Sequence, residues 1–493
     1  MRKRLIATPI WVVIVALTAG YAVVCWSGVE RWHGRSGEDE YSYRDYVNWL
    51  DTQHRIPRRD QNYEYALPIG VPAVGLVVQR AFGTPNYDKP TSPPLQVLPN
   101  MLRRLLWLAL VVGGAFALSR SVWAKLFGAG LLIAAGGWAA AYIVAATDNE
   151  GWLPLVLIAY VTSVALVPAS AWVAREAFPR VRAAPVFGAV GAMLLPPILA
   201  ATLYFHPDPP FALLASVAFA LTLRALRRGL TIRAGIALGA ALGLAAWTRQ
   251  SAPLIAVSLG LAVALVARRS AWRYLVAAGA TMLVVISPWW YQQTLRYDNP
   301  IKSNLNRPGY MLDHQPLSFY VSFPVALVTD PHTPHFRDAL LPRFHAYIWS
   351  DWYGGYHEWK NPKRFASFLS SVQSVLGLGG DALVLGALAF LGFPAVVRSL
   401  RRRGEPRDGP LVVLTSLFVL SWLAFAGTLI RFPQRDGDPI KVRYLLFLAP
   451  VCVALAIAGG RALVLHGGRR RALFLAWLAA YAVSWALTIA TAF

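Results

Sequence analysis

The chain has 493 residues, of which 56% are hydrophobic and only 14% are charged. A soluble domain carries about 25% charged residues, so this composition excludes an ordinary soluble enzyme and favours an integral membrane protein. The formal net charge of +23 lies mostly in short tracts between apolar runs, a pattern of membrane proteins that argues against nucleic acid as a partner.

Apolar runs of about 17–25 residues recur along the chain, and each is long enough to cross a hydrocarbon core about 30 Å thick. They predict an all-α polytopic membrane protein with about thirteen transmembrane helices. The expected spans are 8–26, 101–119, 123–146, 153–174, 184–204, 211–223, 234–247, 252–267, 274–292, 376–397, 410–430, 443–460 and 472–491. The spans at 211–223 and 234–247 are short for a full crossing.

The distribution of charge predicts the orientation. Arg2, Lys3 and Arg4 precede the first span and place the N-terminus in the cytoplasm. Alternation then gives the cytoplasmic side 24 of the 47 basic residues but only three of the 24 acidic residues, Glu176, Glu405 and Asp408. An odd number of spans puts the C-terminus outside, in a multi-pass protein of the cell membrane that contacts membrane lipids.

The spans divide the chain into five parts. These are the first span (1–26), a first outer loop (27–100), spans two to nine (101–292), a large second outer loop (293–375) and the last four spans (376–493). Aromatic residues between Tyr41 and Leu50 alternate with polar ones and predict a helix lying in the membrane interface. Residues 68–83 are apolar but broken by proline, and we expect a re-entrant or interfacial element there.

Two acidic clusters follow outer ends of spans. Glu38-Asp39-Glu40 comes soon after the first span, and Asp148-Asn149-Glu150 fills the short loop after the third. Adjacent carboxylates repel one another, which should raise the pKa of at least one of them. Taken alone, the first cluster is better explained as a solvated acidic turn, and the second as acidic residues that cap the following helix.

Together the two clusters resemble those of the GT-C membrane glycosyltransferases, the superfamily of protein O-mannosyltransferases, lipid A aminoarabinose transferases and oligosaccharyltransferases. Asp39-Glu40-Tyr41 is similar to the acidic motif of their first outer loop, and Asp148-x-Glu150 is similar to the second. Softer similarities are Trp247-Thr248-Arg249, the stretch from Pro288 to Pro300, and Arg443-Tyr444-Leu445. The resemblance covers most of the chain, but its motifs are short. The Tyr63–Pro68 stretch departs from it, because it lacks the lysine of many relatives.

The resemblance implies an inverting transfer of a sugar from a polyprenyl-phosphate donor to a glycan, lipid or protein acceptor at the outer face. The acceptor hydroxyl needs a base, for which Asp39 is the candidate, with Glu40, Asp148 and Glu150 as further catalytic groups.

The leaving phosphate needs cations. Arg249 is the basic residue of a short outer turn, and Arg431, Arg435, Lys441 and Arg443 make an outer loop that breaks the inside-positive trend. These residues are candidates for binding the donor phosphate, although lipid head groups would explain them as well.

Other sites are less defined. Asp351 and Trp352, in an aromatic stretch, are candidates with Tyr41 for binding the sugar or the acceptor; an interfacial aromatic belt is the alternative. No cofactor is certain. Asp39, Asp148 and Glu150 have the oxygen ligands that a divalent cation such as Mg²⁺ or Mn²⁺ prefers, so metal use stays open. His332 and His335 lack obvious partner ligands for zinc.

Three other functions stay open on the sequence. A transporter or flippase would carry inverted repeats and charges near the midplane, which we do not find in the sequence. A glycan polymerase or ligase with a diphosphate-linked donor would rely on basic rather than acidic catalytic residues. A scaffold would give no reason for acidic clusters at two outer loops.

Overall fold

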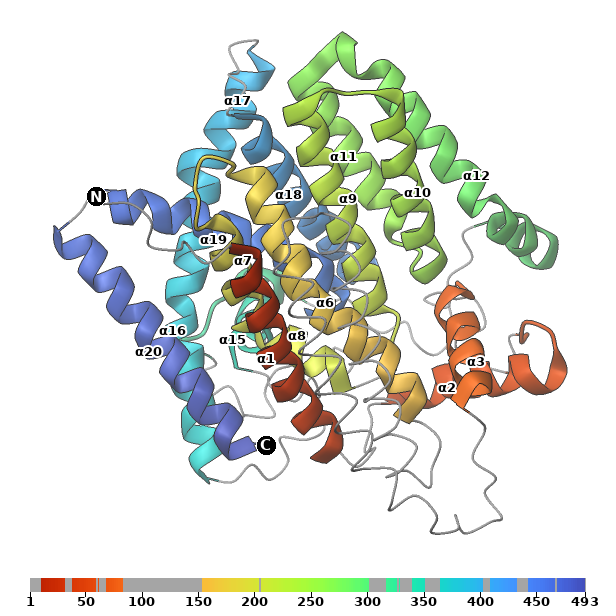
Figure 1. Cartoon of the computed structure of the whole chain (residues 1–493), viewed down its shortest axis with the longest axis horizontal. Coiled ribbons are helices and arrows are strands. Elements are labelled where there is room, and N and C mark those ends of the chain that lie inside the picture. Colours follow the sequence, from red (N-terminus) through yellow and green to blue (C-terminus); the bar gives the residue numbers. More distant parts are fainter. Residues whose placement is uncertain are drawn as a thin grey trace, which may run out of the picture.

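The structure is a computed structural model, and every regular element that it describes is helical (Figure 1). It describes residues 10–31, 38–58, 61, 68–82, 153–203, 205–300, 316–325, 328, 339–350, 364–401, 408–431, 442–465 and 468–492. The predicted spans at 101–119 and 123–146 lie outside these residues, so the number of thirteen stays a prediction.

The described part begins with three helices between residues 10 and 82, followed by the membrane bundle. The helices are α1 (Ile10–Arg31), α2 (Glu38–Gln53), α3 (Gly70–Phe82), α6 (Leu153–Ala177), α7 (Ala184–Met193), α8 (Pro196–Ala200), η2 (Ala201–Leu203), α9 (Asp208–Arg228), α10 (Ile232–Thr248), α11 (Ala252–Ala267), η3 (Arg268–Ala271), α12 (Trp272–Tyr297), α13 (Leu317–Val321), α15 (Leu340–Trp349), α16 (Arg364–Ala387), the π-helical turn η6 (Leu388–Gly392), α17 (Phe393–Leu400), α18 (Asp408–Arg431), η7 (Val442–Leu448), α19 (Ala449–Leu465) and α20 (Gly468–Ala492).

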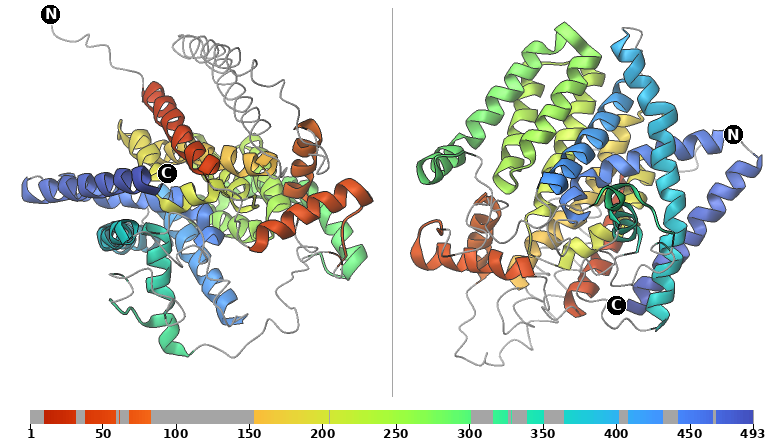
Figure 2. Two further views of the ribbon diagram at one scale, coloured as in Figure 1. Left: turned by 90° about the horizontal axis from the view of Figure 1, so that it is seen from below. Right: turned by 180° about the vertical axis from the view of Figure 1, so that it is seen from behind.

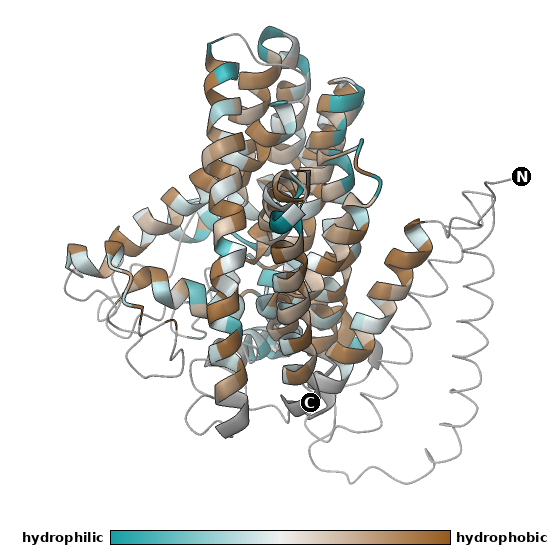
Figure 3. Ribbon diagram, turned by 90° about the vertical axis from the view of Figure 1, so that its left-hand side faces the viewer, coloured by the Kyte–Doolittle hydropathy of each residue, from teal (hydrophilic) through white to brown (hydrophobic). Residues whose placement is uncertain are grey.

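Among the described residues, seven helical stretches are long and apolar enough to cross a membrane, or eight if the bent pair of α7 with α8–η2 is one span. In this count α11 and α12 form one stretch, although Arg268, with φ of 52°, interrupts the helix between them. Hydrophobic residues run along the upright helices, and hydrophilic ones gather at the upper turns (Figure 3). The chain is therefore a multi-pass membrane protein.

Proline explains the bend in the span expected at 184–204. Pro196 and Pro197 follow Met193 closely, and the two halves of the span meet at 63°. A proline removes a backbone donor and clashes with the preceding turn, so the helix stops and restarts in a new direction. The span expected at 211–223 is longer than predicted, since α9 has 21 residues.

Two buried acids are neutralised at one end of the bundle. Glu176 at the end of α6 pairs with Arg227 at the end of α9. Asp408 at the start of α18 pairs with Arg398 of α17 through two contacts of 2.6 and 3.0 Å. We call this the basic end. Glu176 and Asp408 were both predicted on the cytoplasmic side, and each meets a basic residue predicted on that same side. The assignment of this end to the cytoplasm stays a prediction.

Glycines bring α10 and α12 into backbone contact. Gly235, Gly239 and Gly243 are four residues apart and lie on one face of α10. A Cβ atom at Gly239 would lie 2.2 Å from the carbonyl oxygen of Ala278. Small residues at such spacing let membrane helices approach closely. The indole of Trp247 also donates to the carbonyl of Val285 at 2.7 Å, so α12 fixes the end of α10.

Gly239→Ala should lower the melting temperature of the detergent-solubilised protein, because α12 would have to move away, at a cost of about 1–3 kcal/mol. Gly279→Ala on α12 is the matched control, since a Cβ atom there meets nothing within 4 Å. Equal melting temperatures for the two variants would contradict the close contact.

Candidate functional site

A buried carboxylate at the start of α9 is the centre of the candidate site. Asp208 is 2% exposed, and each of its two oxygens contacts a nitrogen at 2.5 Å. Oδ1 meets Nε of Arg249, and Oδ2 meets Nδ1 of His206. A carboxylate is retained in such a buried place only when it is paired. The three residues therefore act as one charged unit.

Prolines determine where α9 begins. Pro207, Pro209 and Pro210 surround Asp208, and a proline in the first turn starts a helix because its missing N–H would have no partner there. Asp208 lies in that first turn, where the helix dipole favours a negative charge.

Arg249 arrives from a different helix. α10 ends at Thr248, and Arg249 has an extended backbone with φ of −148° and ψ of 142°, so its side chain leaves the helix axis. Pro253 at the start of α11 keeps the turn between the two helices short. The side chain of Arg249 is 20% exposed and that of Asp208 is 2% exposed, so a partly accessible arginine pairs with a buried carboxylate.

An aromatic ring covers the guanidinium. Tyr444 of η7 lies with its ring centroid 4.6 Å from Cζ of Arg249. Phe447, one turn further along η7, packs against Phe211 of α9 at 5.4 Å. A cation over a ring face is attracted to it, and the ring leaves the guanidinium edge for an anion.

The helix α2 packs against the site through Tyr43. The ring of Tyr43 packs edge-on against His206 at 5.0 Å and against Phe205 at 6.3 Å. Asp39 and Glu40 precede Tyr43 by one helical turn of α2. Both views of Figure 2 put α2 and α3 beside the end of α12, and Arg296 of α12 donates to the carbonyl of Ile56 at 3.1 Å.

Burial shifts the pKa of one side chain of α2, Tyr46. Tyr46 is fully buried, and this burial, with a smaller contribution from Tyr297, raises the pKa of Tyr46 far above its ordinary value. Its phenol therefore stays neutral. α3 starts beside the site as well, because Gly70 packs so closely on Trp247 that a Cβ atom would lie 2.4 Å from its carbonyl oxygen.

The sequence-predicted site residues have different outcomes. Arg249 is at the centre of the cluster, and Arg443 directly precedes Tyr444 in η7. Arg431 is exposed at the end of α18. Asp39, Glu40 and Tyr41 belong to α2, but their side chains are not described. Asp148, Glu150, Asp351, Trp352 and Lys441, with His332 and His335, lie outside the described residues.

Metal binding stays a prediction. Among the residues that the structure describes, no group of three or more His, Cys, Asp or Glu side chains could hold a metal ion. The proposed ligands Asp148 and Glu150 are not among them.

Two groups were missed by reasoning from the sequence. The first is His206 with Asp208, whose signal is the His-Pro-Asp-Pro-Pro run at the boundary of a span. The second is Asp381, an acid inside the span of α16, paired with His345 of α15 at 2.5 Å. An ionisable residue inside a span is a signal in its own right.

No protein-family model and no curated protein matches the chain. Solved structures similar to it include ArnT from Cupriavidus metallidurans in the apo state, at 16% identity and a TM-score of 0.40, over 90% of this chain and 77% of that one. The same ArnT bound to undecaprenyl phosphate gives 16% identity and a TM-score of 0.42, over 92% and 78%. The Archaeoglobus fulgidus oligosaccharyltransferase with zinc and sulfate gives 17% and 0.47, over 97% of this chain and 52% of that one.

ArnT and the oligosaccharyltransferase are both members of the GT-C superfamily, which the acidic motifs of the sequence resemble. At this level of similarity the function has to be argued from the residues of the chain itself.

Proposed function

We propose that the chain is a membrane glycosyltransferase that moves a sugar from a polyprenyl-phosphate donor to a hydroxyl acceptor. The observation that supports it best is the cation of Arg249, held by buried Asp208 and stacked on Tyr444, beside the helix that carries Asp39 and Glu40. A fixed cation near a carboxylate suits a reaction that releases a phosphate and removes a proton.

Each group has a role in the proposed reaction. The acceptor oxygen attacks the anomeric carbon as the bond from that carbon to the phosphate oxygen breaks, which inverts the configuration. Asp39 takes the hydroxyl proton, with Glu40, Asp148 and Glu150 in support. Arg249 binds the departing phosphate, and Arg443, Arg431 and Lys441 add positive charge around it.

The donor class and the outer-face location rest on the sequence. Sugar nucleotides belong to the cytoplasm, so a sugar used outside has to arrive on a lipid. Asp351, Trp352 and Tyr41 are proposed to bind the sugar or the acceptor. A Mg²⁺ or Mn²⁺ ion on Asp39, Asp148 and Glu150 would stabilise phosphate charge.

Deleting the protein should remove one sugar, a hexose or a pentose, from a cell-envelope glycan and leave its lipid-linked donor in excess. Mass spectrometry of glycans and lipid extracts measures both. Purified protein in detergent, given a polyprenyl-phosphate sugar and the truncated glycan, should restore that mass. The purified protein would then have to fail in this transfer, and vesicles without the protein would have to lose movement of the donor across the membrane, for a flippase to be favoured instead.

A further inference from the structure

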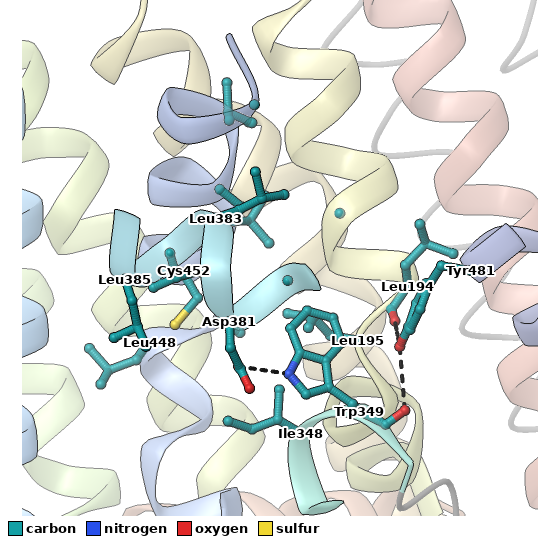
Figure 4. Close-up of a pocket in the computed structure, with 18 of the residues that line it drawn as sticks. Leu194, Leu195, Ile348, Trp349, Asp381, Leu383, Leu385, Leu448, Cys452 and Tyr481 are labelled. Carbon is teal, nitrogen blue, oxygen red and sulfur yellow. Dashed lines mark hydrogen bonds between the residues drawn. The ribbon is translucent and has the colours of Figure 1, made fainter. Parts of the chain in front are cut away.

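A second feature of the bundle is an elongated cavity of about 660 Å³ among described residues of α7, α15, α16, η7, α19 and α20. Its volume is within the range of about 300–1,000 Å³ of small-molecule sites. Figure 4 shows Asp381 and Trp349 at one part of its wall, with Leu383, Leu385, Leu448 and Cys452 around it. Nearly all of the wall is hydrocarbon.

The cavity runs along one face of α19. Residues of α19 line it at every third or fourth position from Ala449 to Val464, which is one continuous face of that helix. At a rise of 1.5 Å per residue this face is roughly 22 Å long. An apolar groove of that length matches an extended hydrocarbon chain better than a compact ligand.

The helix α15 closes the groove at one end. The indole of Trp349 fills a notch of α16, where a Cβ atom at Gly377 or Gly380 would lie 2.3 or 2.1 Å from the ring. Its Nε1 donates to Oδ1 of Asp381 at 2.8 Å. His345 contacts Oδ2 of Asp381 at 2.5 Å through Nδ1.

Both ring nitrogens of His345 hold this closure. Nδ1 contacts Asp381, and Nε2 faces the carbonyl oxygen of Ser374 at 2.7 Å. Polar atoms at this end are thus engaged by one another.

Positive charge marks the other end. Arg461 lines the groove where α19 ends, and Arg469, Arg470 and Arg471 follow at the exposed start of α20. The sequence predicts these residues on the same side of the membrane as the basic end. A cationic rim above a hydrocarbon groove is complementary to a phosphate group with an acyl chain beneath it.

The groove is separate from the Arg249 site. η7 divides the two: Tyr444 covers Arg249 on one side, and Leu445 and Leu448 line the groove on the other. Because a 3₁₀ helix has three residues per turn, 445 and 448 share a face that 444 does not.

We propose that this groove binds one acyl chain of a membrane phospholipid from the leaflet at the basic end, with the lipid phosphate at Arg461. The bound chain is distinct from the proposed donor, because it lies across η7 from Arg249. Its detection requires no sugar transfer, so failure of the proposed function would leave the lipid site standing.

The test uses the full chain in nanodiscs that contain phosphatidylglycerol with a diazirine on one acyl chain. After illumination, peptide mass spectrometry should find saturable labelling on the groove faces of α16 and α19. Labelling of Leu475 and Val483, which are exposed on the described part of α20, should instead rise linearly with probe. Labelling that is linear everywhere, or absent from the groove, would overturn the proposal.

Variants of groove residues test whether the saturable labelling comes from the groove. Ala456→Phe places a ring in the groove and should reduce the saturable labelling by about tenfold. Ala479→Phe is the matched control on the exposed face of α20 and should leave it unchanged. Arg461→Glu should lower labelling by the anionic probe without filling the groove. Equal labelling in Ala456→Phe, Ala479→Phe and the unmodified chain would also overturn the proposal.

Discussion

Arg249→Ala should raise the KM for a polyprenyl-phosphate sugar by about 10- to 150-fold, because a hydrogen bond to a charged group contributes about 1.5–3 kcal/mol. The substitution removes the cation that Tyr444 covers and Asp208 holds. Initial rates of transfer at varied donor concentration measure the effect. Arg249→Lys should recover part of it, since the ammonium keeps the charge but loses the planar stack on the ring.

A loss of stability in Arg249→Ala would also raise the KM for the donor, and a double variant separates this effect from the loss of phosphate binding. Arg249→Ala leaves the buried carboxylate of Asp208 without this cation, and breaking a buried ion pair costs about 3–5 kcal/mol of stability. The double variant Arg249→Ala/Asp208→Ala removes both charges and should recover much of that stability. Donor KM should stay high in the double variant. If it returned to the unmodified value, Arg249 would serve only as the partner of Asp208.

Asp39→Asn should lower kcat by about 10²–10⁴-fold while leaving expression, insertion and melting temperature unchanged. Asparagine has the size of aspartate but does not take up a proton, so the acceptor hydroxyl would lose its base. Single-turnover transfer with saturating donor measures the chemical step. Asp39→Glu should keep part of the rate.

The control for this substitution lies on the same helix. Asp45 belongs to α2 and is exposed, so Asp45→Asn changes the net charge of the helix by the same amount. It should leave kcat within about twofold of the unmodified enzyme, since surface changes usually cost within 0.5 kcal/mol. Full activity in Asp39→Asn, or equal losses in both variants, would remove Asp39 from the catalytic role.

Apolar run length predicted most of the described helices, because hydrocarbon thickness dictates it. α6, α18 and α20 follow the expected spans closely. The start of α9 was missed, since His206 and three prolines resemble a loop when read in order. The prolines instead sit in the first turn, where they start the helix. The bend before α8 was also missed, although Pro196 and Pro197 gave its signal.

The candidate site could be predicted only in part. Charge placement singled out Arg249, because one basic residue in a short turn is visible in a sequence. Its partner could not be found in this way: Asp208 lies on another helix, and the bundle packing that joins them leaves no periodic pattern. The same holds for His345 and Asp381, which belong to two different helices, α15 and α16.

The short helix η7 constrains how the chain can change. Tyr444 faces Arg249, whereas Leu445, Leu446 and Leu448 line the groove. Because a 3₁₀ helix has three residues per turn, removing a single residue from 442–448 would turn the remaining ones by about 120°. A leucine would then face the guanidinium of Arg249, and Tyr444 would face the groove. Substitutions in η7 that conserve side-chain size should therefore be tolerated, whereas insertions and deletions should not.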